Sequence, residues 1–109
     1  MNIIELIGEA TEYEKKQAVE RKKVRNWLKT ISAFANTAGG TLIFGVTDDG
    51  EVIGLEDVKA DSEFVSQKIK ERISPYPNVV MKIHKTMGGK EVILVQVPVG
   101  GELCSGVEP

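Results

Sequence analysis

The sequence predicts an α+β domain in which two main helices pack against a single mixed sheet. Three observations lead to this fold class: a helical apolar stripe from Val24 to Ala35, a short apolar strand that ends in an acidic turn, and a strand pair near the C-terminus. The 109 residues suit one domain with one modest core.

The first helix is predicted by five apolar residues at the spacing of one helical face: Val24, Trp27, Leu28, Ile31 and Ala35. We expect this helix to begin between Ala18 and Lys22 and to end at Thr37. A buried indole removes a large area from water, so Trp27 is interpreted as a core residue rather than a base-stacking platform. We expect the stripe to pack on a sheet that contains Leu42, Phe44, Ile93 and Val95.

In the next segment, glycines and an Asp-Gly pair mark where the predicted elements begin and end. Gly39 and Gly40 favour a helix cap, and Thr41 to Val46 is an apolar run rich in strand formers. Asp49-Gly50 favours a type I′ turn into a further strand over residues 51–55.

The second half predicts a helix and a hairpin. Asp57 or Asp61 can cap a helix that ends at the prolines of residues 74–77. Residues 79–86 and 91–97 then form two strands joined at Gly88-Gly89. Near the N-terminus, the alternation of residues 10–16 suits an exposed strand, but their Glu and Lys residues suit a helix as well.

The run AFANTAGGTLIFGVTDDGEVIGL, residues 33–55, resembles the signature of the Schlafen-type AlbA-like domain, also grouped as a divergent AAA-type family. The similarity covers nearly the whole chain. It favours a strand at residues 10–16, and so gives a sheet of about five strands in the order β-α-β-β-α-β-β. It implies a domain over residues 1–99 and a tail, 100–109, that begins a truncated C-terminal continuation.

Charge is unevenly distributed along the chain. Residues 15–29 contain seven cations and one anion, a net charge of +6, so the rest of a chain of net charge −2 carries −8. A basic patch on an acidic body is typical of a nucleic-acid-binding module, although a solvated helix face has the same composition.

The resemblance implies a DNA-binding or RNA-binding domain of a transcriptional regulator. We expect this fragment to bind rather than to catalyse, and to need no cofactor. The residues expected to contact phosphates are Lys15, Lys16, Arg21, Lys22, Lys23, Arg25 and Lys29.

Two alternatives remain open. In nuclease members of the family, two glutamates five residues apart and a later aspartate hold a divalent metal; the matching residues here are Glu9, Glu14 and Asp48. They would bind Mg²⁺ or Mn²⁺ for endoribonuclease chemistry, but surface acid and turn chemistry are the simpler interpretation of these residues. The other alternative is a structural domain that forms a homodimer through a strand edge.

Other classes of function find no support in the sequence. It contains no GxxxxGK[ST] or GxGxxG motif, and His84 and Cys104 are its only histidine and cysteine. No apolar stretch approaches the roughly 20 residues of a membrane span. We therefore expect a cytoplasmic protein without a membrane partner.

Overall fold

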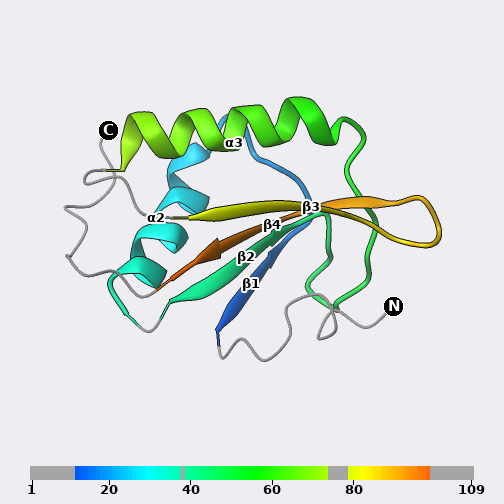
Figure 1. Ribbon diagram of the computed structural model, residues 1–109, viewed down its shortest axis with the longest axis horizontal. Coiled ribbons are helices and arrows are strands. Elements are labelled where there is room, and N and C mark those ends of the chain that lie inside the picture. Colours follow the sequence, from blue (N-terminus) through cyan, green and yellow to red (C-terminus); the bar gives the residue numbers. More distant parts are fainter. Residues whose placement is uncertain (1–11, 38, 74–78, 99–109) are drawn as a thin grey trace.

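A computed structural model describes residues 12–37, 39–73 and 79–98, and these form an α+β arrangement of two helices on one mixed sheet of four strands (Figure 1). The elements in chain order are β1 (Tyr13–Lys16), α2 (Val24–Ala35), β2 (Gly40–Phe44), α3 (Val58–Arg72), β3 (Val80–Lys85) and β4 (Glu91–Val97). In these described ranges, neither helix has the length and apolar character needed to cross a membrane.

The sheet has the strand order β1-β2-β4-β3. β1 pairs with β2 in parallel, through the crossover helix α2, and the other two pairs are antiparallel. The strand that the family resemblance favours near the N-terminus is therefore present as β1. It forms one edge of the sheet, and β3 forms the other.

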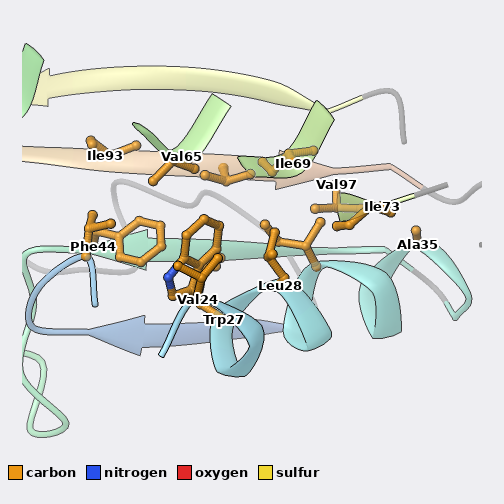
Figure 2. Packing of buried hydrophobic residues seen from close by; sticks show 14 residues of the cluster. Val24, Trp27, Leu28, Ala35, Phe44, Val65, Ile69, Ile73, Ile93 and Val97 are labelled. Carbon is orange, nitrogen blue, oxygen red and sulfur yellow. The ribbon is translucent and has the colours of Figure 1, made fainter. Parts of the chain in front are cut away.

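Both helices cover the same face of the sheet, and their apolar side chains form one cluster with those of the strands (Figure 2). The predicted stripe of α2 is buried there against Leu42, Phe44, Ile93 and Val95, as expected. α3 adds Val65 and Ile69 to this cluster. A smaller apolar cluster lies on the other face, where Val46 and Val52 cover alternate residues of β2 and β4.

The predicted strand at residues 51–55 is wrong, and the sheet has one strand fewer than expected. Only an isolated bridge joins Val46 to Val52, because Gly45 (φ 106°) and Gly54 (φ 81°) interrupt the extended conformation on each side. The turn before it is not type I′ either. A type I′ turn needs a positive φ at Asp49, but among the described residues only glycines have one. The turn that forms instead is closed by a hydrogen bond from the Gly50 N–H to the Thr47 carbonyl (2.9 Å).

The first helix begins later than predicted, at Val24. The chain before it is instead tied to the core, because the Trp27 indole donates a hydrogen bond to the Glu20 carbonyl (Nε1 to O, 3.1 Å). The helix ends at Ala35 rather than Thr37. Gly39, at φ 85°, donates its N–H to the Phe34 carbonyl (2.9 Å) and so caps the end, as its position in the sequence predicts.

The second helix follows its sequence signals closely. Asp57 caps α3, because its carboxylate accepts a hydrogen bond from the Ala60 N–H (3.1 Å). The helix ends at Arg72, with Ile73 as its C-cap residue. The residues predicted to stop it, 74–77, lie outside the described residues. The hairpin of β3 and β4 also forms as predicted, and its turn is closed between Thr86 and Lys90.

The burial of Trp27 leads to a stability prediction. Trp27→Ala should lower the free energy of unfolding by about 3–5 kcal/mol, because the side chain is completely buried and its removal leaves a cavity. Urea denaturation measures this change. Met87→Ala, at a fully exposed position, is the control and should cost less than about 0.5 kcal/mol. Equal effects of the two changes would contradict this packing.

Candidate nucleic-acid interface

The basic segment, residues 15–29, runs from β1 through an irregular connection into α2. Its seven cations fall into three groups in the structure. Four are exposed and, within the described residues, make no hydrogen bond or ion pair through their side chains: Lys22, Lys23, Arg25 and Lys29. We call these four residues the basic face.

The basic face surrounds the start of α2. Lys22 and Lys23 precede the first turn, and Arg25 and Lys29, four residues apart, lie on one side of the helix. Lys23 is the N-cap residue but its side chain makes no capping hydrogen bond, and the first turn contains no acidic residue. The backbone N–H groups at this helix end therefore add their positive potential to that of the four cations.

Lys15 and Lys16 point to opposite faces of the sheet. The parallel register places Lys16 beside Phe44, on the face that the helices cover, and Lys15 beside Ile43 on the other. The Lys15 ammonium donates to the Asp48 carbonyl oxygen (2.8 Å) and lies 5.7 Å from the centre of the Tyr13 ring. Both lysines are half-buried, so they are less accessible than the basic face.

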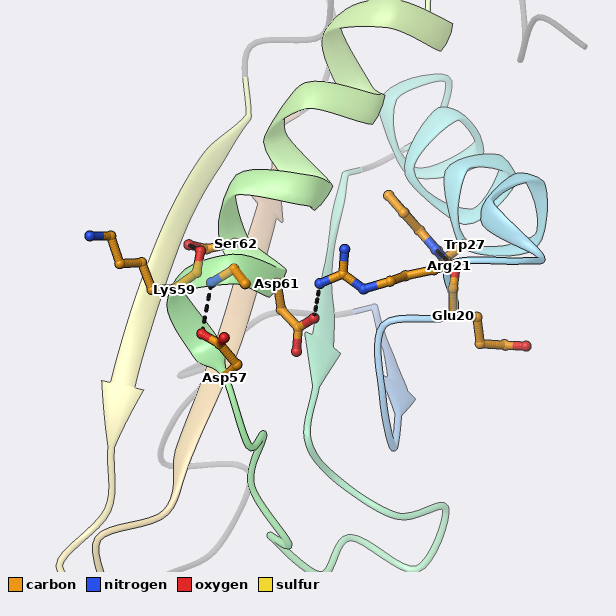
Figure 3. Close-up of polar contacts among 8 residues, drawn as sticks. Glu20, Arg21, Trp27, Asp57, Lys59, Asp61 and Ser62 are labelled. Carbon is orange, nitrogen blue, oxygen red and sulfur yellow. Dashed lines mark hydrogen bonds and ion pairs between the residues drawn. The ribbon is translucent and has the colours of Figure 1, made fainter.

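Arg21 is engaged with α3 (Figure 3). Its guanidinium donates to the Asp61 carboxylate (Nη2 to Oδ1, 2.8 Å) and its Cζ lies 4.5 Å from the centre of the Phe64 ring. Phe64 in turn lies 6.4 Å from Trp27, measured between ring centres. Sequence reasoning missed this role of Asp61 and Phe64, because no local pattern links residues 40 positions apart.

The structure describes two of the three predicted metal ligands, Glu14 and Asp48. Glu14 and Asp48 line one open pocket of about 500 Å³, together with Glu20 and the residues that connect β1 to α2. The Glu14 carboxylate accepts a hydrogen bond from the Thr30 hydroxyl of α2 (Oε2 to Oγ1, 2.6 Å). Glu9 lies outside the described residues. Within residues 12–37, 39–73 and 79–98, no three acidic, His or Cys side chains form a group that could hold a metal ion.

Comparison with known proteins identifies the family. The family model described as Schlafen, AlbA_2 matches residues 9–103. The chain belongs to this family.

Two similar proteins extend the comparison. An uncharacterized ATP-binding protein of Ureaplasma parvum serovar 3 is 30% identical over 101 residues, which cover 84% of this chain and 28% of that protein. The chain therefore spans little more than a quarter of this relative. The solution structure of the N-terminal domain of a putative ATP-dependent DNA helicase RecG-related protein from Nitrosomonas europaea has a TM-score of 0.64 at 24% identity. The match covers 89% of this chain and 69% of that domain, and at this identity it shows a shared fold.

Proposed function

We propose that this Schlafen AlbA_2 domain binds nucleic acid as part of a regulator of transcription, with the basic face as its phosphate-binding surface. The observation that carries the proposal is the contrast between the two helices. α3 has Asp57 and Asp61 at its N-terminus against Lys59, and Lys70 and Arg72 in its last turn against Glu71, so the charges at both ends on balance stabilise the helix dipole.

α2 has the opposite arrangement at its N-terminus. Lys22, Lys23 and Arg25 stand next to the positive end of the helix, where each cation costs stability by about 0.3–1 kcal/mol at low salt. A helix face needed only for solubility would not require cations at this end. An anionic ligand would neutralise them, and a phosphate backbone suits both the cations and the N–H groups of the helix end.

The proposal predicts a strongly salt-dependent affinity. Lys22→Glu, Lys23→Glu and Arg25→Glu together should weaken binding to all sequences alike, because phosphate contacts position the ligand but do not read bases. The slope of log K against log salt should become flatter by about 0.9 for each phosphate that is no longer neutralised on duplex DNA, or about 0.7 on single strands. Fluorescence anisotropy with labelled duplex DNA, single-stranded DNA and RNA measures both quantities.

The matched control is Lys82→Glu, Lys85→Glu and Lys90→Glu, which changes the net charge equally but on the β3–β4 hairpin, where all three lysines are exposed. This control should retain the affinity and slope of the parent. Equal decreases in affinity in both triple variants would mean a diffuse charge effect and contradict the proposed surface. Undetectable binding by the parent protein at about 50 mM salt would favour the homodimer alternative, in which half-exposed Val80 and Ile83 on the edge strand β3 contact a second copy.

The nuclease alternative has one observation in its favour, the shared pocket of Glu14 and Asp48. Under the proposed function we expect binding without cleavage when Mg²⁺ or Mn²⁺ is added to single-stranded RNA. Gel analysis of the RNA measures this. If metal-dependent cleavage does occur and is abolished in Glu14→Gln and Asp48→Asn but not in Glu20→Gln, which lines the same pocket, the domain is an enzyme.

A further inference from the structure

We propose that Arg21 is a positioning residue: by pairing with Asp61 and stacking on Phe64 of α3, it holds the connection between β1 and α2 so that Lys22 and Lys23 face the ligand. This inference rests on the proposed function. It assigns to Arg21 a different role from the other exposed cations of its segment, because its guanidinium already has a carboxylate partner.

Three consecutive residues fasten the connection to the core. The Val19 side chain is buried in the main apolar cluster. The Glu20 carbonyl accepts the Trp27 indole N–H (3.1 Å), and Arg21 contacts α3 as described. Lys22 and Lys23 are exposed and follow directly in the chain, so their backbone positions depend on these contacts.

The contact of Arg21 with α3 is made by a pair that is partly exposed, with 48% of the Arg21 side chain and 17% of the Asp61 side chain accessible. A pair this exposed contributes little to global stability. Its effect is local: it removes conformational freedom from the segment that carries two of the four phosphate-binding cations, and such preorganisation raises affinity.

The test uses a variant for which the two explanations predict opposite changes in affinity for nucleic acid. Asp61→Asn removes a negative charge near the basic face, so electrostatics alone predicts tighter binding of nucleic acid. The positioning role predicts binding weaker by about threefold to tenfold, since the freed segment must be ordered on binding. The matched control is Glu63→Gln, the same removal of charge at an exposed position of the same helix, which should bind as tightly as the parent or more tightly.

A second pair of variants keeps the charge and changes the geometry. Arg21→Lys cannot reproduce the planar guanidinium that pairs and stacks at once, so it should weaken binding to a similar degree. Arg25→Lys should retain the affinity, because a lysine ammonium also contacts phosphate. If Arg21 instead contacted a phosphate directly, Arg21→Lys and Arg25→Lys would bind nucleic acid with equal affinity.

Trp27, the only tryptophan, reports the state of the segment independently of binding. Acrylamide quenching of its fluorescence should increase in Asp61→Asn and in Arg21→Lys but not in their controls, with the unfolding midpoint unchanged. If Asp61→Asn lowers that midpoint, the positioning role is judged from the affinities of Arg21→Lys and Arg25→Lys instead.

Binding of nucleic acid by Asp61→Asn at least as tight as by Glu63→Gln overturns the positioning role and leaves the proposed function standing. A parent protein that does not bind overturns the proposed function itself.

Discussion

The indole of Trp27 connects the parts of this domain that have to stay together. Its ring meets Phe44 of β2 edge to face, with ring centres 5.7 Å apart and an interplanar angle of 89°, and it also lies against Phe64 of α3. Its N–H, which burial would otherwise leave unpaired at a high cost, is used to hold the Glu20 carbonyl. One side chain therefore fixes α2 on the sheet, α3 on α2, and the connection from β1 to the first turn of α2.

This arrangement explains how α2 can carry charges that its own dipole disfavours. An isolated helix of this length would be marginal, and cations at its N-terminus would weaken it further. In the domain, the apolar stripe of α2 is buried in the core, and this burial outweighs the electrostatic cost of Lys23 and Arg25. The stability of α2 therefore does not depend on which residues its exposed side carries, and that side can hold cations suited to an anionic ligand. α3, by contrast, has more acidic than basic residues at its N-terminus and more basic than acidic residues in its last turn, which suits its dipole.

The sequence predicts the helices and three of the strands well, because each has a local signal: the stripe around Trp27, the cap at Asp57 and the glycine turn at residues 88–89. The first strand needed the family resemblance, since its polar residues alternate without an apolar face. The error at residues 51–55 arose because an Asp-Gly pair suits several turns. The positive φ of Gly45 and Gly54, where an added Cβ would crowd Val92 and Lys90, has no local sequence signal beyond glycine itself. At the candidate site, the exposure of Arg25 and Lys29 could be predicted from helical spacing. The partner of Arg21 could not, since it depends on how α3 crosses α2.

The geometry of the basic face also bears on what kind of recognition the proposed function can involve. Its cations lie around one helix end and along one side of α2, while the opposite side of that helix is buried in the core. Long, mobile side chains in this position contact backbone phosphates readily, but base edges are read by a helix that enters a groove with several polar side chains in fixed positions. Asn26 is the one amide side chain among the exposed residues of α2. A surface of this kind anchors and orients a nucleic acid, and it leaves discrimination between sequences to contacts made elsewhere.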